Sequence, residues 1–470
     1  MPRNAAARVL QETSPCSHAL RKLYVRVPYA YALLQTLSFS GRNPEHLEHL
    51  NDAEWRNLLD LCDRTQLTLL LGDLGAQYLP PWVQQRILRN QLDNSTRFSR
   101  VQMSLAEISE ALARKAIEFV ILKGFTNASH FIHNPKLRSQ GDLDLWCQPD
   151  VVWPARDALN NLGYRAIGKS KGRHLDPMIR EASWDWTGDY YAPSLPIPVD
   201  LHYQLWDASM EYIAGPSEAA MWERRSSVVL PGGQCVQQLD LADALTFACV
   251  HVLMHLLHGD VRLQRFWELA FFMHSHSDES FWEYWKSLYS IEERQMYVIP
   301  LALGFEWFGC KLPGVIAAEI TGLPMDTLSW MDRYCSSPLI SFFSTGSLFE
   351  NKDELLLNLC LLRSFKSKAR VVARRLLPIQ AVASDYGGEN TGRNSLASAL
   401  RLLRFKVERL RRHIGSLPLA CWRLALWSWR CRRLSRDLVI FPIASHFLLA
   451  WWHPLAAAFS AALRHLRFRH

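Results

Sequence analysis

The stretch Leu137-Arg-Ser-Gln-Gly-Asp-Leu-Asp-Leu145 decides the fold that we predict for this 470-residue chain. It places Asp142 and Asp144 two residues apart in a segment where apolar and acidic residues alternate, which indicates a β-strand over residues 142–147. Because side chains alternate across a strand, both carboxylates lie on one face and the leucines beside them lie on the other. The stretch therefore predicts a strand with one acidic face and one face in an apolar core.

The paired carboxylates of Asp142 and Asp144 are typical of a metal site. Held side by side they repel each other, which costs stability unless a cation lies between them. Mg²⁺ and Mn²⁺ prefer oxygen ligands, and Mg²⁺ commonly binds through one or two carboxylates together with substrate phosphates. Asp200, in the alternating segment Val199-Asp-Leu-His-Tyr-Gln-Leu205, is our candidate for a third carboxylate on a neighbouring strand. Three such carboxylates predict a two-metal site, in which one ion activates the attacking oxygen and the other holds a triphosphate.

A bare D-x-D pair also occurs by chance, so the order of the elements around it carries the prediction. The β-branched and apolar run 117–122 predicts a buried strand, Lys123-Gly124 ends it, and residues 126–132 are typical of a short helix. Such a helix would present free backbone N–H groups to phosphate oxygens, and Gly124 would let the backbone approach them closely. Further along, two alternating segments, 183–187 and 199–205, predict a hairpin.

These motifs, in this order, resemble the nucleotidyltransferase superfamily with the DNA polymerase β-like fold. More closely, they are similar to an uncharacterised bacterial nucleotidyltransferase family whose core reads L-K-G, then R-x-x-G-D-[IL]-D-L, then [VI]-[DE]-L-H. The matching segments are Leu122-Lys-Gly124, Arg138-Ser-Gln-Gly-Asp-Leu-Asp-Leu145 and Val199-Asp-Leu-His202. The resemblance implies an α+β fold, with a catalytic domain made of a small mixed sheet and helices, flanked by helical N- and C-terminal regions.

The resemblance also implies an activity and a set of site residues. A nucleoside monophosphate would move from an NTP to an unknown acceptor, a small molecule, a peptide or protein, or an RNA, and pyrophosphate would be released. The metal carboxylates, holding Mg²⁺ (or Mn²⁺), would be Asp142, Asp144 and Asp200. The nucleotide-binding residues would be Lys123, Gly124, Thr126, Arg138 and Gly141. The wider superfamily usually has Gly-Ser or Gly-Gly at its first motif, whereas here Thr126 is the nearest hydroxyl to Gly124.

Several histidines are secondary candidates for the site. For His202 a place in the core or in hairpin pairing and a place in the site both stay open. His251, His255 and His258 have helical spacing and share one face, yet no H-E-x-x-H motif is present, because position 252 is Val. We therefore favour packing of this helix against the catalytic domain, or contact with nucleotide, over a metal site. Just beyond it, Arg262 and Arg265 are weaker candidates, with Glu268 as their partner.

Helical spacing and breaks divide the chain into four regions. Asn51 is a candidate N-cap before Glu54, and Pro80-Pro81 interrupts the helical pattern before 83–113. Another helix is expected over 155–162, and Pro231-Gly-Gly233 marks a boundary. The expected regions are an N-terminal helical region 1–115, a catalytic domain 116–230, a helical domain 231–360, and a basic helical region 361–470 that contains an apolar stretch 438–463.

The net charge of +8 is unevenly spread along the chain. Residues 361–470 hold 18 Arg, 3 Lys and 4 acidic residues, a net charge of +17, so residues 1–360 carry −9. This asymmetry indicates an anionic partner for residues 401–470, such as an anionic membrane surface, nucleic acid or the acidic part of the chain itself; a solvated arginine face is the alternative. The stretch 438–463 has no charged residue but contains Pro442 and Pro454, so a membrane span, an interfacial hairpin and ordinary core helices all stay open.

The composition restricts the class of protein and the cellular compartment that we expect. With 49% hydrophobic and 21% charged residues, the chain is neither largely disordered nor a small disulfide scaffold. The 10 cysteines form no C-x-x-C pair and are typical of free, mostly buried thiols in a reducing compartment. With no apolar run near the N-terminus, we expect a cytoplasmic protein, with residues 401–470 as a peripheral membrane contact. Two alternatives to the enzyme above are a non-enzymatic membrane- or partner-binding protein that keeps the fold, and a toxin-like nucleotidyltransferase that modifies RNA.

Overall fold

The computed structural model of the chain describes residues 27–376, apart from 125, 140, 168–171, 181–187, 231–232, 336–337 and 340–352, together with 403, 404, 407 and 411. It separates into two compact units. The first contains the chain up to Leu323 and holds the sheet and the site described below. In the second, α18 (Asp353–Leu361) is followed by α19 (Phe365–Leu376), and the Trp330 indole donates a hydrogen bond to the carbonyl of Asp353.

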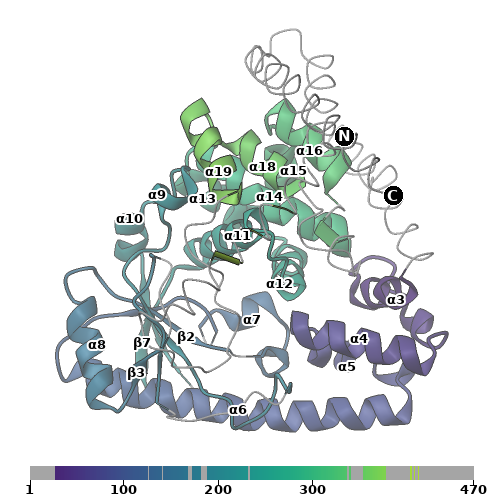
Figure 1. Cartoon of the computed structure of the whole chain (residues 1–470), viewed down its shortest axis with the longest axis horizontal. Helices are drawn as coiled ribbons and strands as arrows, with labels where there is room; N and C mark the ends of the chain where they lie inside the picture. Colours follow the sequence, from purple (N-terminus) through teal and green to yellow (C-terminus); the bar gives the residue numbers. More distant parts are fainter. Residues whose placement is uncertain are drawn as a thin grey trace, which may run out of the picture. The chain divides into compact units, whose positions relative to one another are not determined.

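A seven-stranded mixed sheet with the order β3-β4-β5-β2-β1-β7-β6 forms the centre of the first unit (Figure 1). Its strands are β1 Val120–Ile121, β2 Leu143–Trp146, β3 Arg165–Ala166, β4 Met178–Ile179, β5 Val199–His202, β6 Ser226–Val229 and β7 Cys235–Gln238. The central strand β2 runs antiparallel to β1 and parallel to β5. The strand that carries the D-x-D motif is therefore flanked on both sides by hydrogen-bonded neighbours.

Helices make up most of the remaining described chain. Before the sheet they are α3 Pro28–Leu37, α4 Asp52–Thr65, α5 Thr68–Leu74 and α6 Pro81–Ala113, with the 3₁₀ turns η1 Pro44–Leu47 and η2 Ala76–Tyr78. Between strands they are α7 Ala128–Phe131, η3 Pro135–Leu137, α8 Val152–Asn161, α9 Ala208–Glu211 and α10 Glu218–Glu223. After the sheet they are α11 Leu241–Leu257, α12 Leu263–Ser275, α13 Glu279–Leu288, α14 Ile291–Phe308, α15 Gly314–Thr321 and α16 Met325–Tyr334.

Local signals set the N-terminal helix boundaries as the sequence predicts. Asn51 caps α4 through a capping box, because its side chain accepts from the backbone of Glu54 and the Glu54 carboxylate accepts from the backbone of Asn51. The long helix α6 begins at Pro81, the second proline of the predicted break and two residues before the predicted start at 83. Proline is tolerated in the first turn because its missing N–H has no helical partner there.

The two faces of the sheet pack against different helices. Leu143 and Leu145 lie on the face that packs on α6 and α8, and Figure 1 shows α6 running beneath that part of the sheet. Trp146 lies on the other face, in a cluster with Trp222 of α10 and Phe247 of α11. The alternation expected for the D-x-D strand is therefore present, and its acidic face is the one that looks toward α11.

The elements around the site are shorter than the sequence predicts. The strand expected over 117–122 is formed only by Val120–Ile121, and the helix expected over 126–132 is the single turn α7. Asn127, just before α7, has φ 55°, a left-handed conformation that no α-helix interior tolerates. The strand expected over 142–147 spans Leu143–Trp146, and the helix expected over 155–162 begins earlier, at Val152.

The predicted hairpin and the predicted domain boundary at 231 can each be compared with the sheet. The first arm of the predicted hairpin, 183–187, lies outside the described residues, and the antiparallel neighbour of β5 is β4. The boundary expected at 231 falls in the hairpin between β6 and β7. Because β7 pairs in parallel with β1, the sheet extends to Gln238.

Cysteines and membrane spans were also among the expectations. None of the seven cysteines among the described residues forms a disulfide bond, and five of them are buried. Within the same residues, no helix is both long and apolar enough to span a bilayer. The stretch 438–463 and nearly all of the basic region 401–470 lie outside the described residues.

The packing of α14 on α12 provides a test of the fold near the site. Gly304 of α14 has no room for a side chain, since an added Cβ would lie 3.0 Å from the backbone carbonyl oxygen of Phe266 in α12. Alanine normally stabilises a helix interior by about 1 kcal/mol relative to glycine. Here we expect Gly304→Ala to destabilise the protein instead, by about 1–3 kcal/mol, because backbone must move. Denaturant unfolding would measure this, with Gly322→Ala as the control, whose nearest contact is 3.4 Å; equal effects of the two changes would contradict it.

Candidate active site

The pairing of β2 with β5 brings two acidic residues into direct register. Asp144 lies opposite Asp200, and two positions further Trp146 lies opposite His202. The His202 Nε2 atom lies 3.0 Å from Oδ1 of Asp144. One ligand atom from each of Asp144, Asp200 and His202 lies within 4.8 Å of the others, and within the described part of the chain this is the group that could hold a metal ion. His202, whose place the sequence left open, therefore lies in this cluster.

Lys123 connects the site to the turn after β1. Its Nζ atom lies 2.9 Å from Oδ2 of Asp144 and 3.4 Å from Oδ2 of Asp142. Both D-x-D carboxylates thus share one ammonium group, which confirms that they lie on the same face. Asp142 is the more exposed of the two, with 34% of its side chain accessible against 5% for Asp144, and it stands outside the Asp144–Asp200–His202 cluster.

Burial and the surrounding charges set the protonation of the two central carboxylates in opposite directions. Burial alone would raise the pKa of Asp144, but Lys123 and His202 together hold that pKa below its ordinary value. Burial, together with the neighbouring Asp144 and Asp142 carboxylates, raises the pKa of Asp200 to about 8. Burial opposes the charge of Lys123, yet Asp142 and Asp144 leave its pKa above the ordinary value. Asp200 is therefore the carboxylate that lacks sufficient positive charge.

These residues fit a divalent cation. Oδ1 of Asp200 is buried and has no hydrogen-bond partner among the described residues. Unpaired buried carboxylate oxygens are costly, and carboxylates next to an imidazole are ligands for divalent metals. A cation at this position would supply the charge that keeps Asp200 ionised. The donor set differs from the expected one, since His202 is inside the cluster and Asp142 is beside it.

The segment before β4 contributes two residues that sequence reasoning did not find. His174 forms a bridge with His202, and its Nδ1 atom lies 4.0 Å from Oδ1 of Asp200. Burial and the nearby His202 lower the pKa of His174 to about 4, so its imidazole is neutral at pH 7. Arg173, the residue before His174, interacts electrostatically with Asp144 and Asp200. No motif marks these positions, because their approach depends on an antiparallel pairing distant in sequence.

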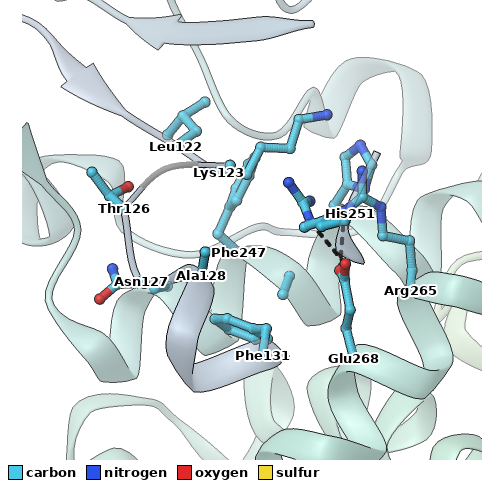
Figure 2. Close-up of a pocket in the computed structure, with 14 residues that line it drawn as sticks. Leu122, Lys123, Thr126, Asn127, Ala128, Phe131, Phe247, His251, Arg265 and Glu268 are labelled. Atoms are coloured by element: carbon cyan, nitrogen blue, oxygen red, sulfur yellow. Dashed lines mark hydrogen bonds and ion pairs between the residues drawn. The ribbon is translucent and has the colours of Figure 1, made fainter. Parts of the chain in front are cut away.

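A cavity of about 50 Å³ lies beside the turn after β1 (Figure 2). Four of the expected nucleotide-binding residues line it, namely Lys123, Gly124, Thr126 and Arg138. Gly141 is not among the lining residues; its carbonyl accepts from Arg97 at 3.3 Å. The opposite wall comes from α11 and α12, through His251, Arg265 and Glu268. The expected phosphate cradle therefore has a second side that the D-x-D region does not supply.

Two features of this turn differ from the expected phosphate contacts. The Thr126 hydroxyl donates to the carbonyl of Ile121 at 3.3 Å, so it is engaged within the turn. The helix that follows is only the single turn α7, which is too short to build a substantial dipole at its N-terminus. The positive groups near the cavity are therefore side chains rather than a helix end.

The three histidines of α11 have separate partners. His255 Nδ1 lies 2.8 Å from Asp260, and His258 at the C-cap pairs with Glu211 at 3.2 Å. His251 contacts the His255 ring and lines the cavity. Within the described residues, these imidazoles are not among the groups that could hold a metal ion. Their role in packing or in nucleotide contact stays a prediction.

The helix after α11 joins Arg138 to the cavity wall. Arg265 pairs with Glu268, as the sequence suggested, while Arg262 pairs with Asp260 instead. The strongest partner of Glu268 is Arg138, whose Nε lies 2.7 Å from Oε1. The two residues lie 130 positions apart in the sequence, so no local sequence pattern predicts their contact.

A comparison with family models places the chain. The model described as "Uncharacterised nucleotidyltransferase" matches residues 51–299, which is more than half of the sequence. The chain therefore belongs to this family, which implies a nucleotide as its substrate. No curated protein and no solved structure matches the chain. The matched region includes the whole sheet, Asp144, Asp200 and the cavity.

The raised pKa of Asp200 predicts a pH dependence of stability in the metal-free protein. The folded state holds a proton on Asp200 up to about pH 8, whereas the unfolded chain releases it near the ordinary value of about 4. The folded state therefore binds the extra proton in this window, and stability falls as pH rises through it. Asp200→Asn removes this dependence, so the variant should unfold a few degrees above wild type at pH 8.5 and close to it at pH 5.

Thermal unfolding in a chelating buffer measures the effect. Asp157→Asn is the matched control, because that carboxylate is 57% exposed and should leave the wild-type profile unchanged. Parallel pH profiles for wild type and Asp200→Asn would show that Asp200 keeps an ordinary pKa.

Proposed function

We propose that this nucleotidyltransferase-family chain transfers a nucleoside monophosphate from an NTP to an acceptor and releases pyrophosphate. One observation carries the proposal: Asp144, Asp200 and His202 converge on one face of the sheet next to a cavity lined with cationic side chains. Carboxylates that hold a divalent cation beside a phosphate site are the essential parts of a nucleotidyl-transfer centre.

The proposed roles follow from the contacts. Asp144, Asp200 and His202 would hold Mg²⁺ or Mn²⁺, with Asp142 close by as a further carboxylate. When bound, such a cation supplies charge neutralisation at the phosphate oxygens. Lys123 contacts both D-x-D carboxylates and also lines the cavity, so its ammonium is placed to balance either the carboxylates or a phosphate.

The proposed reaction is a single displacement at the α-phosphorus. A hydroxyl, phosphate or amine of the acceptor attacks the α-phosphorus in line, and the bond from that phosphorus to the bridging oxygen of the β-phosphate breaks. The electron pair leaves with pyrophosphate, and an acceptor hydroxyl or amine gives up one proton. Negative charge grows on the leaving group, where Lys123 and Arg138 would stabilise it.

The acceptor class separates the remaining alternatives. A small-molecule, protein or RNA acceptor would place the transferred label in a different fraction of a cell lysate, and label in RNA would favour the toxin-like alternative. A non-enzymatic protein would transfer no label. A cytoplasmic location, with residues 401–470 against an anionic membrane surface, stays a prediction, because that region lies almost entirely outside the described residues.

Removal of the central carboxylate tests the activity. We expect Asp144→Asn to lower label transfer from α-³²P-labelled NTPs into a lysate by at least about 100-fold, because a preorganised charged group is lost. Asp157→Asn, on the exposed surface of α8, should transfer at the wild-type rate. Thermal unfolding would verify that both variants fold. Equal transfer by wild type and Asp144→Asn would remove this site from the reaction.

The place of His202 predicts a metal preference. Mg²⁺ and Mn²⁺ both prefer oxygen ligands, but Mn²⁺, as a transition metal, accepts an imidazole ligand more readily than Mg²⁺ does. We therefore expect His202→Gln to weaken Mn²⁺ binding by about 10-fold or more and to affect Mg²⁺ binding less. Calorimetric titration without nucleotide would measure both, with His258→Gln as a control on an imidazole that is 54% exposed. An equal loss for the two metals would show that His202 orients Asp144 without ligating the ion.

A further inference from the structure

We propose that Arg265 and Glu268 of α12 complete a binding site for the β- and γ-phosphates of the nucleotide, in the cavity beside Lys123 and Gly124. Arg265 would contact the phosphates, and Glu268 would be a positioning residue that holds Arg138 and Arg265 at the cavity wall. The inference rests on the proposed function and adds to it a second wall of the site, contributed by the helices after the sheet.

The central contact is a carboxylate shared by two guanidinium groups. Oε1 of Glu268 accepts from Nε of Arg138 at 2.7 Å, and Oε2 accepts from Nη1 of Arg265 at 3.0 Å. In Figure 2 two dashed contacts meet at the Glu268 carboxylate, and His251 lies on the same side of the cavity as Arg265. One arginine comes from the segment before the D-x-D strand and the other from α12, so Glu268 fixes two distant parts of the chain at one wall.

The charge of the wall favours an anion. Lys123, Arg138 and Arg265 line the cavity with three positive charges, against the single negative charge of Glu268. Burial and the neighbouring His255 hold the pKa of His251 well below its ordinary value, so this imidazole is neutral at pH 7 and adds no charge. The cavity of about 50 Å³ has room for one phosphate group in place of several water molecules, and the second phosphate would extend from it past Lys123 toward Asp144.

Stability does not require such an arrangement. The side chains of Arg138, Glu268 and Arg265 are only 7%, 7% and 13% exposed. Taking three charged groups out of water is costly for each ion, and apolar side chains of similar volume commonly serve stability equally well. Guanidinium groups held in fixed directions do, however, match the geometry of phosphate oxygens. The buried pairs are therefore better explained by ligand recognition than by packing.

The cavity also lies next to the carboxylate cluster. Lys123 lines it while its ammonium lies 2.9 Å from Asp144, so phosphates in the cavity would lie next to the carboxylate cluster. The β- and γ-phosphates must lie beside the α-phosphate that reacts there. A phosphorylated acceptor offers the same chemistry from a second source, and competition with nucleotide separates the two.

Pyrophosphate binding to the full-length chain in EDTA tests the site without metal and without turnover. We expect Arg265→Ala to weaken binding by about 10-fold or more, since a charged hydrogen-bond donor is lost. Arg265→Lys keeps the charge without the planar fork and should lose less. Arg262→Ala is the control, because Arg262 is 51% exposed, pairs with Asp260 and does not line the cavity.

Glu268→Gln separates positioning from simple charge. The substitution makes the wall more positive, so charge alone would tighten pyrophosphate binding. If Glu268 positions the two arginines, binding should instead weaken several-fold, and Glu268→Asp should restore part of it. Tighter binding by Glu268→Gln would overturn the positioning role. A non-hydrolysable NTP should displace pyrophosphate from wild type; failure to displace it would assign the site to another ligand and overturn the proposal.

The outcome is distinguishable from that of the proposed function. Absence of pyrophosphate binding by wild type, or equal binding by wild type and Arg265→Ala, overturns the phosphate site even if nucleotidyl transfer is observed. Conversely, Arg265-dependent binding that NTP displaces, in a protein that transfers no label, supports the phosphate site and removes the enzymatic function.

Discussion

The register that sets Asp144 opposite Asp200 in parallel strands is the constraint on which the rest of the structure depends. It places two carboxylates side by side at the boundary of an apolar core, where water cannot screen their repulsion. Lys123 supplies positive charge next to Asp144, and the His202 ring forms a hydrogen bond with it. Oδ1 of Asp200, by contrast, has no hydrogen-bond partner among the described residues. The chain therefore holds an uncompensated acidic position in an otherwise well-packed sheet. Such a position is the feature of the structure most directly explained by a ligand.

The positively charged side chains near the carboxylates come from three different parts of the chain. Lys123 follows the strand next to the D-x-D strand, Arg138 precedes that strand, and Arg265 belongs to a helix that begins after the sheet is complete. Close packing of α14 on α12, at Gly304, sets the position of the helix that carries Arg265 and Glu268. The helical region after the sheet is therefore part of the candidate site and not merely a support for it.

The sequence predicted those parts of the site that depend on local geometry. Strand alternation places Asp142 and Asp144 on one face, and the capping signals at Asn51 and Pro81 fix helix starts, because each depends on residues a few positions apart. It did not predict the roles of His174 or the Arg138–Glu268 pair, since these contacts join residues far apart in the chain. It also overestimated the helix after Gly124, where the left-handed backbone of Asn127 delays the first helical turn.

The long helix α6 has a mechanical consequence. Its 33 residues extend for about 50 Å, packing on α5 near its start and on the sheet near its end. Midway, Arg97 and Arg100 donate to backbone carbonyls of the segment that leads into β5, including that of Leu195. A continuous helix curves only gently, so α6 links the N-terminal helices mechanically to the segment that leads into the strand of Asp200. Any opening of the site that separated α6 from the strand of Asp200 would therefore break the contacts of Arg97 and Arg100 with the Leu195 carbonyl.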